Sequence, residues 1–274
     1  MYLDYWQLNG KPFESHPGEA FCFRGEAFQA AEHKLRYALD SRLPAVAFAG
    51  PAGVGKTLLL ESLAGQLPSN VGPLVHVVFP QMSERDLLVY LAERFGAPPT
   101  AQPRHTVEES LRRLEYLFQQ NRTSGRHAVL AIDEAHLLED SGLLEPLRLL
   151  LNLRPGGETA FTLVLCGQPT LLPILARFGT LDDRIDLKVT LAALSAEQTA
   201  AYVQHRLAAA GATRTIFSPD ALATAHKLAH GVPRRINRLC DLALLVGFAN
   251  SQHTLDGADV QAVSDELVNV AMAA

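Results

Sequence analysis

The octapeptide Gly50–Thr57, Gly-Pro-Ala-Gly-Val-Gly-Lys-Thr, constrains the fold of this 274-residue chain more than any other stretch. It matches G-x-x-x-x-G-K-[ST], a loop in which glycines let successive backbone N–H groups point at one anion. The apolar run Ala45–Ala49 precedes the loop and Leu58–Leu63 follows it. A buried strand, a tight turn and a helix start are therefore predicted. A plain surface turn can match the same pattern, but these flanks favour phosphate binding.

Each part of this stretch has an expected role in binding a nucleotide. The residues expected to contact it are Gly50, Pro51, Ala52, Gly53, Val54, Gly55, Lys56, Thr57 and Leu58. A helix that begins near Lys56 would add its positive dipole end to the anion site. Lys56 can reach the β- and γ-phosphates, and the Thr57 hydroxyl can ligate Mg²⁺. ATP and Mg²⁺ are the cofactors that this arrangement predicts.

The composition is typical of a globular protein with an ample core, with 48% hydrophobic and 19% charged residues. Its net charge is 24 − 29 = −5, so overall charge does not favour nucleic acid as a partner. Cys22, Cys166 and Cys240 are isolated in the sequence, which predicts buried thiols in a reducing compartment rather than a zinc site. We expect no signal peptide, no transmembrane segment and a cytoplasmic location.

Apolar strand-like runs alternate with helical patterns through the middle of the chain. The expected strands are Ala45–Ala49, Leu74–Phe79, Ala128–Ile132, Phe161–Gln168 and Ile185–Leu191. This alternation predicts a parallel sheet covered by helices on both faces, an α/β three-layer αβα sandwich. From Leu194 onward only helical patterns remain, starting near Ser195, Ser218, Arg234 and Asp256.

Three segments are therefore expected. Residues 1–43 would form an N-terminal segment and helix packed on the core, the first 25 of them irregular and aromatic-rich. Residues 44–192 would form the phosphate-binding domain, with a loop at 67–73, a helix at 142–153 and a loop at 96–105. Residues 193–274 would form a small all-helical domain.

Two carboxylates close the third apolar run, at Asp133 and Glu134. In a parallel sheet this places both at the edge where the phosphate loop ends. Asp133 would hold the Mg²⁺ shell and Glu134 would polarise the attacking water. The alternative is the solvated start of a loop, but the neighbouring phosphate loop favours catalysis.

Gln168 and His136 each have two interpretations at the same site. A carboxamide at Gln168 can hydrogen-bond both the γ-phosphate and the water, or it can simply end a strand before Pro169. His136 can sense the γ-phosphate or be an ordinary loop histidine.

Several arginines remain as groups that could stabilise the transition state. Arg184, or Arg177 one loop earlier, could act as a finger on a neighbouring subunit's nucleotide. A salt bridge from Arg184 to Asp182 or Asp183 is the alternative. Arg234 could contact phosphates from the helical module, or join Arg235 and Arg238 in a patch for nucleic acid; spacing does not decide between these.

Taken together, these stretches resemble the AAA+ ATPases, and more closely their ExeA/GspA branch, with the TniB/TnsC-type transposition ATPases as relatives. The matching segments are Lys11–Phe13, Gly50–Thr57, Val129–His136, Leu149–Leu153, Leu165–Leu171, Asp183–Ile185 and Gly231–Asp241. They cover nearly the whole chain in the family's order. The resemblance implies a P-loop NTPase core followed by a helical lid.

The resemblance also implies residue roles and an assembly. It makes Lys56 and Thr57 the Walker A pair, Asp133 and Glu134 the Walker B pair, Gln168 sensor 1, Arg184 the arginine finger and Arg234 sensor 2. Homo-oligomeric rings or filaments with ATP at subunit interfaces are implied as well. The function expected is Mg²⁺-dependent ATP hydrolysis that drives oligomerisation and remodels a protein partner complex of secretion or pilus type. An ATP-dependent, DNA-binding regulator of the transposition type is the alternative, and a nucleotide switch that scarcely hydrolyses is a third.

Overall fold

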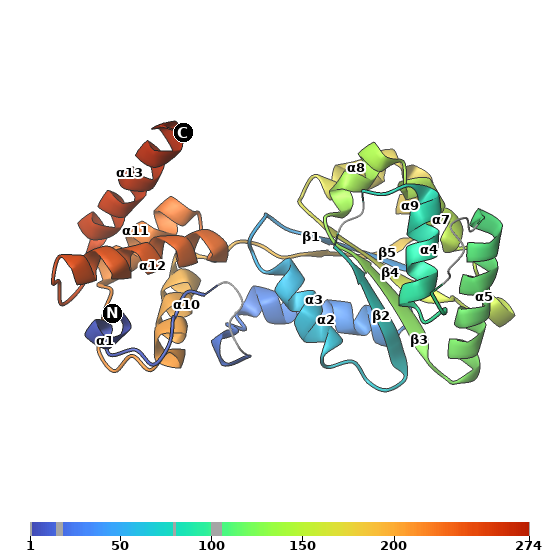
Figure 1. Cartoon of the computed structure of the whole chain (residues 1–274), viewed down its shortest axis with the longest axis horizontal. Coiled ribbons are helices and arrows are strands. Elements are labelled where there is room, and N and C mark those ends of the chain that lie inside the picture. The colour runs from blue at the N-terminus through green and yellow to red at the C-terminus, as the bar shows by residue number, and fades with distance from the viewer. Residues whose placement is uncertain (1, 15–18, 79–80, 100–105, 274) are drawn as a thin grey trace. The chain divides into compact units, whose positions relative to one another are not determined.

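The structure is a computed structural model, and it describes residues 2–14, 19–78, 81–99 and 106–273. The chain forms two compact units, whose elements are labelled in Figure 1. The α/β unit comprises Ala30–Gly50 and Lys56–Leu191. The helical unit comprises Met1–Gln29, Pro51–Gly55 and Ala192–Ala274.

A five-stranded sheet forms the centre of the α/β unit. Its strands are β1 (Ala45–Ala49), β2 (Val71–Val77), β3 (His127–Ile132), β4 (Phe161–Gly167) and β5 (Ile185–Thr190). Their order is β2-β3-β4-β1-β5, and every neighbouring pair is parallel. The parallel sheet expected from the alternating pattern is confirmed.

Burial of the strands follows their place in the sheet. Every residue of β1, β3 and β4 is buried, whereas the edge strand β2 mixes buried and partly exposed residues, and in the other edge strand, β5, only Val189 is buried. Central strands of a parallel sheet are covered on both faces, which explains why their sequences are unbroken apolar runs.

The helices around the sheet are α2 (Glu26–Asp40), α3 (Lys56–Ala64), α4 (Glu84–Arg94), α5 (Val107–Thr123), α6 (Leu138–Ser141), α7 (Leu144–Leu150), α8 (Leu171–Arg177) and α9 (Gly179–Asp182), with short 3₁₀ turns η2 (Ala135–Leu137) and η3 (Pro155–Gly157). The crossover through α3 runs toward β2, and the later crossovers run the opposite way. Because parallel crossovers are right-handed, α3 and the later helices must cover opposite faces. Figure 1 shows α2 and α3 together on one face.

Two elements differ from the sequence-based expectation by more than a single residue at a boundary. β2 begins at Val71 rather than Leu74, so it includes Pro73, which had suggested a loop. Proline is tolerated there because β2 is an edge strand and needs no second ladder partner. The helix expected at 142–153 is shortened to α7, since a 3₁₀ turn and α6 precede it. The expected strand end at 79 and most of the expected loop at 96–105 (residues 100–105) lie outside the described residues.

The helical unit consists of α1 (Tyr2–Trp6), α10 (Ala196–Ala209), α11 (Pro219–Ala229), α12 (Pro233–Ala249) and α13 (Gly257–Ala273), with the 3₁₀ turn η1 (Glu19–Phe21). The expected start of α10 is confirmed by a capping box, in which Ser195 and Gln198 each bond the other's backbone N–H at 3.1 Å. Pro219 occupies the first turn of α11, as expected.

Of residues 1–43, predicted to pack on the phosphate-binding core, the first residues instead pack within this helical unit, whereas those from Ala30 onward group with the α/β unit. Trp6 is fully buried, and its indole N–H donates to the carbonyl of Leu244 at 2.9 Å. Buried Arg206 donates to the carbonyl oxygens of Pro12 (2.5 Å) and Glu14 (2.7 Å). These contacts join positions between 192 and 238 residues apart, so no local pattern reveals them. The segment expected to be irregular begins with α1.

A buried histidine makes the stability of the α/β unit depend on pH. His127, 3% exposed, lies 2.9 Å through Nε2 from the hydroxyl of Thr162, which donates to the Leu43 carbonyl at 2.7 Å. The Nε2–H of a neutral ring is therefore the donor. Burial, with a smaller effect from Arg42, lowers the pKa of His127 to about 4.

Because the unfolded chain binds this proton from about pH 6.5 downward, the contribution of His127 is complete above pH 6.5 and is lost as pH falls toward 4. The free energy of unfolding should fall by about 2–3 kcal/mol between pH 7 and 4.5 for this reason. The free energy of unfolding of His127→Gln should not show this decrease with falling pH. His253→Gln, which changes an exposed histidine, should show the same decrease as wild type. Urea unfolding at several pH values measures both; equal pH slopes in wild type and His127→Gln would contradict the assignment.

Candidate nucleotide-binding site

The expected site residues of the α/β unit converge because three strands end side by side. β1 leads into Gly50, β3 into Asp133 and β4 into Gln168, and β4 lies between the other two. The N–H of Gly50 donates to the carbonyl of Gly167 at 3.1 Å, which ties two of these ends together. Ligands of parallel sheets bind at this carboxyl edge. The sheet order therefore places Gln168 between the phosphate loop and the two carboxylates.

The phosphate loop has the backbone that its glycines predict. Gly53 and Gly55 adopt φ of +81° and +107°, values that residues other than glycine rarely adopt. α3 begins at Lys56, whose side chain is only 6% exposed and donates from Nζ to the Gly50 carbonyl at 2.9 Å. The ammonium group is thus held at the carboxyl end of β1.

Thr57 and Asp133 form the candidate metal site. The Thr57 hydroxyl donates to Oδ2 of Asp133 at 2.6 Å, and Asp133 is 3% exposed. One hydroxyl and one carboxylate are the few protein oxygens that Mg²⁺ takes when phosphates and water complete its octahedral shell. The two residues therefore fit Mg²⁺ held together with a bound triphosphate.

The pKa of Asp133 lies well below the usual carboxyl range. Burial raises this pKa, but the nearby His76 ring and the Thr57 hydroxyl outweigh that effect. The Glu134 N–H, 2.9 Å from Oδ1, and the Cys166 thiol lower the pKa further. Nε2 of His76 lies 3.7 Å from Oδ2, so its ring makes an electrostatic contact rather than a hydrogen bond. Asp133 is therefore an anion at neutral pH, as a metal ligand must be.

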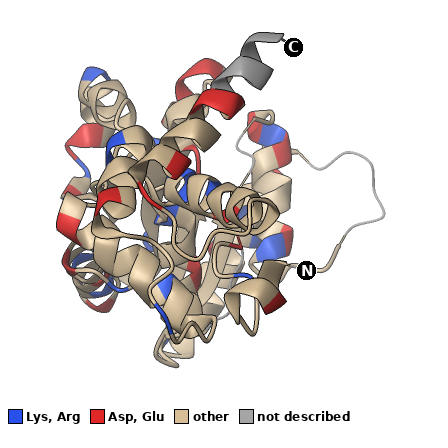
Figure 2. Cartoon of the chain, turned by 90° about the vertical axis from the view of Figure 1, so that its left-hand side faces the viewer, with Lys and Arg blue, Asp and Glu red and all other residues tan. Residues whose placement is uncertain are grey.

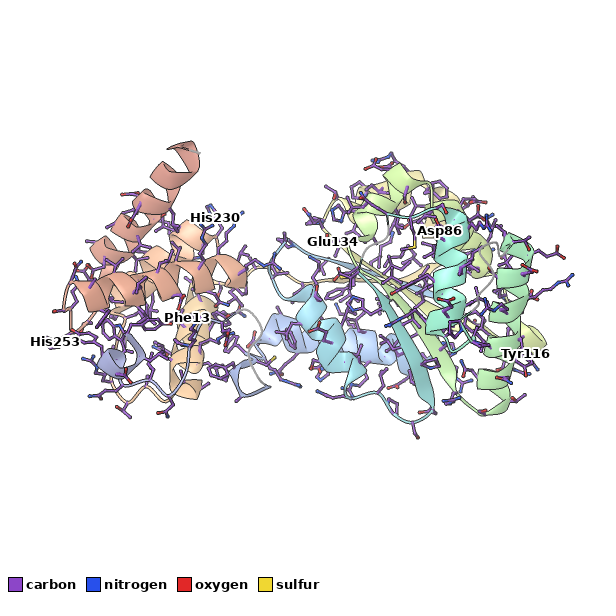
Figure 3. The ribbon with its side chains drawn as sticks, in the orientation of Figure 1. Phe13, Asp86, Tyr116, Glu134, His230 and His253 are labelled. Carbon is purple, nitrogen blue, oxygen red and sulfur yellow. The ribbon has the colours of Figure 1, made fainter. Side chains whose placement is uncertain are left out.

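Glu134 has the backbone outlier of the site. Its φ of 50° and ψ of 35° are left-handed, a conformation that a non-glycine residue holds at a cost of about 1–2 kcal/mol. The Glu134 side chain is 45% exposed, and its Oε2 lies 3.4 Å from Nδ1 of His136. Figure 3 labels Glu134 where β3 ends. The carboxylate is thus accessible to a water molecule beside Asp133.

His136 links two of the candidate residues. Its Nδ1 lies 3.4 Å from the Glu134 carboxylate and 3.5 Å from the backbone N–H of Gln168. The sequence leaves two interpretations of His136 open and does not mark His76 or Cys166 as site residues. Both are interior strand residues in apolar runs, so only the neighbouring strands bring them to Asp133.

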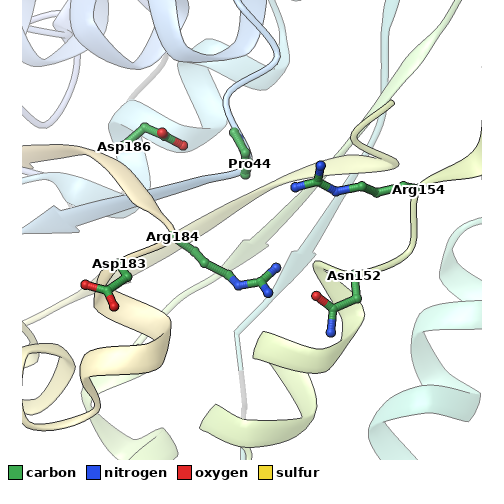
Figure 4. Close-up of a pocket in the computed structure, with 6 residues that line it drawn as sticks. All are labelled: Pro44, Asn152, Arg154, Asp183, Arg184 and Asp186. Atoms are coloured by element: carbon green, nitrogen blue, oxygen red, sulfur yellow. The ribbon is translucent and has the colours of Figure 1, made fainter. Parts of the chain in front are cut away.

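The arginine candidates differ in their partners. Arg177 donates to both carboxylate oxygens of Glu139, at 2.6 and 2.8 Å. Asp182, the expected alternative partner of Arg184, instead pairs with Lys188 at 2.6 Å. Arg184 lines a pocket just before β5 (Figure 4). Ile185 pairs with Ala45, the first residue of β1, so Arg184 lies at the amino edge of the sheet, opposite the edge with Gly50.

Arg234 belongs to the helical unit, near the start of α12. Its N–H donates at 3.2 Å to the carbonyl of Gly53, which groups with that unit. Arg234, Arg235 and Arg238 are all exposed. In the view of Figure 2, basic and acidic residues are interspersed.

Two features are absent from the described part of the chain. Within residues 2–14, 19–78, 81–99 and 106–273, no three His, Cys, Asp or Glu side chains cluster as a metal site. Over the same ranges, no helix has the length and apolar character needed to cross a bilayer.

Residues 42–175 match the AAA domain family, in agreement with the fold and the phosphate loop. The chain belongs to the AAA+ ATPases. It is 33% identical over 277 residues to General secretion pathway protein A of Aeromonas hydrophila, an alignment that covers 98% of this chain and 49% of that protein. The chain thus spans about half the length of this relative, and the expected ExeA/GspA-like resemblance is confirmed.

Solved structures share the fold. The ORC2 protein of Aeropyrum pernix, in ADPNP-ADP complexes, is similar with a TM-score of 0.69 at 16% identity, over 94% of this chain and 72% of that one. The Drosophila ORC bound to DNA is similar with a TM-score of 0.70 at 17% identity, over 96% and 66%.

Proposed function

We propose that this chain binds Mg²⁺·ATP at the carboxyl edge of its sheet and hydrolyses it with Glu134 as the base. One observation carries the proposal: Thr57 and an ionised Asp133 meet at 2.6 Å, with the Glu134 carboxylate on the next residue. The ORC2 neighbour, with the same fold, was solved with ADPNP and ADP. The same loop type in this chain supports adenine nucleotide as the ligand.

Each side chain has a separate task in this proposal. The loop N–H groups and Lys56 bind the phosphates, and Glu134 orients a water and accepts its proton as the water attacks the γ-phosphorus. Gln168 hydrogen-bonds that water and the γ-phosphate, and Arg234 retains the sensor-2 role that the resemblance implies. Mg²⁺, when bound through Thr57 and Asp133, neutralises charge on the phosphate oxygens.

Arg184 is proposed as a finger for a second copy of the chain. β1 has five residues, so at about 3.3 Å each the two sheet edges are roughly 16 Å apart. Arg184 at the amino edge is therefore too far from the phosphate loop of its own chain. This separation supports a homo-oligomeric ring or filament with ATP at its interfaces, residues 44–192 acting as the ATPase domain and 193–274 as its lid.

ATP-driven assembly would remodel a protein partner, and the similarity to General secretion pathway protein A supports a secretion or pilus complex in contact with the cytoplasm. A second candidate is an ATP-dependent DNA-binding regulator. Exposed Arg234, Arg235 and Arg238 favour it, as does the fold shared with an ORC bound to DNA.

The experiment that tests this function compares wild type with Lys56→Ala. Wild type should release heat on titration with Mg²⁺·ATP, release phosphate and increase in mass with ADPNP by light scattering. Lys56→Ala should lose binding by roughly 100-fold or more, because a buried charge-assisted contact to the phosphates is removed. Lys34→Ala, an exposed lysine of α2, is the matched control and should behave as wild type.

Absence of heat and phosphate release in wild type would refute the ATPase proposal. A duplex DNA arm separates the two candidates. If the regulator is correct, DNA binding appears only with ATP and weakens steeply as salt rises. Phosphate release without DNA binding favours remodelling of a protein partner.

A further inference from the structure

The amino edge of the sheet carries a pocket that the proposed catalytic steps do not use. Its volume is about 460 Å³, and it is lined by Pro44, Asn152, Arg154, Asp183, Arg184 and Asp186. Pro44 precedes β1 and Arg184 precedes β5, while Asn152 and Arg154 follow α7. Segments from three parts of the chain therefore meet here (Figure 4).

Two guanidinium groups in this pocket have no partner. Neither the Arg154 nor the Arg184 side chain hydrogen-bonds or ion-pairs with any residue that the structure describes. Figure 4 shows Arg184 and Asn152 turned toward one another and Arg154 reaching in from the opposite wall. Asp183 points away from the Arg184 side chain in the same view. The ten N–H donors of the two guanidinium groups thus line this pocket unpaired, with the Asn152 carboxamide beside them.

Arg154 and Arg184 differ in this respect from Arg148 and Arg177. Arg148 pairs with Glu145 at 2.6 Å and Arg177 with Glu139 at 2.6 Å. Arg154 and Arg184 remain unpaired although Asp183 and Asp186 line the same pocket. Paired planar guanidinium groups match the several oxygens of a terminal phosphate, which a single ammonium group cannot do.

We propose that Arg154 and Arg184 form a two-arginine site for the γ-phosphate of ATP bound to a second copy of this chain. Arg154 is the new member of the site, and Asn152 supplies a further donor. The inference rests on the proposed function, since it needs ATP at a subunit interface. The anion cannot be the chain's own nucleotide, because the phosphate loop leaves β1 at the opposite edge.

An apolar residue beside the pocket fits a second copy as the occupant. Leu149 of α7 is 48% exposed, and its carbonyl accepts from the Asn152 N–H at 3.0 Å. An exposed leucine next to unpaired arginines offers a second subunit an apolar contact beside a charged one, a combination found in protein–protein interfaces. A small free anion would make no use of Leu149.

The test compares Arg154→Gln with wild type and with Arg112→Gln, an exposed arginine paired with Glu108 on α5. Arg154→Gln should bind Mg²⁺·ATP as wild type does, because its own phosphate loop is intact. Its turnover should fall roughly 10- to 100-fold, as expected for one charge-assisted contact to the reacting phosphate. The protein concentration needed for ADPNP-dependent assembly should rise by a similar factor. Arg112→Gln should change neither quantity.

Mixing subunits tests whether Arg154 acts on the neighbour. Glu134→Gln subunits bind ATP and carry Arg154, so adding them to Arg154→Gln subunits should restore turnover at about one interface in four. No recovery on mixing, or Arg154→Gln equal to wild type in turnover and assembly, would overturn the inference. If wild type hydrolyses ATP and only Arg184→Gln is slow, the proposed function holds but the role of Arg154 is refuted. If wild type does not hydrolyse ATP, both the proposed function and the role of Arg154 are refuted.

Discussion

Glu134→Gln is expected to lower the turnover of ATP by roughly 10²–10⁴-fold while leaving its affinity for Mg²⁺·ATP unchanged. The amide cannot accept the proton of the attacking water, yet it has the same length and leaves Lys56, Thr57 and Asp133 in place. Phosphate release under single-turnover conditions measures the chemical step, and calorimetric titration measures binding. ATP-dependent assembly should persist in this variant, because the bound nucleotide is no longer consumed.

Glu145→Gln is the matched control. Its side chain is 46% exposed, close to the 45% of Glu134, and it pairs with Arg148 on the surface of α7. Loss of a surface pair has little energetic effect, so this variant should turn over as wild type does. If Glu134→Gln hydrolyses ATP as fast as Glu145→Gln, the assigned base is wrong and another group must orient the water.

Arg184→Gln should lower turnover by about 10³-fold or more at protein concentrations that saturate assembly. The substitution removes a positive charge that, in the transition state, contacts the γ-phosphate of ATP bound to a neighbouring subunit. ATP binding by the variant itself should be unaffected. The measurement is phosphate release as a function of protein concentration, so that a defect in turnover is separated from a defect in association.

Arg177→Gln distinguishes the two finger candidates. Arg177 is 62% exposed and already bonded to Glu139 through both carboxylate oxygens. Its loss should change turnover by no more than about threefold, as for an exposed ion pair. A 10³-fold loss in Arg177→Gln with a normal Arg184→Gln would reverse the assignment and would imply that Arg177 leaves Glu139 in the assembled state.

Local patterns predicted most of the α/β unit because they are consequences of burial. β1 has the expected bounds because all five of its residues are apolar and covered on both faces. The capping boxes at Thr106 and Ser195 form because each pairs with a residue three positions later. β2 was predicted less well, since Pro73 signals a loop except in an edge strand, and edge position depends on the whole sheet.

For the candidate site, the sequence by itself determined the phosphate loop and the pair Asp133 and Glu134. Their chemistry is encoded by contiguous residues whose spacing reflects a turn at a strand end. Those residues meet whenever the strands are parallel, because carboxyl ends then share one edge.

Only the tertiary structure decided what surrounds them. It placed His76 and Cys166 beside Asp133, packed the first residues of the chain against Arg206, paired Arg177 and left Arg154 and Arg184 unpaired in one pocket. Each of these depends on side chains from separate elements, brought together by sheet order and helix packing. No repeat of 2 or 3.6 residues records such contacts, because periodicity reports which face is buried and not which partner lies across it.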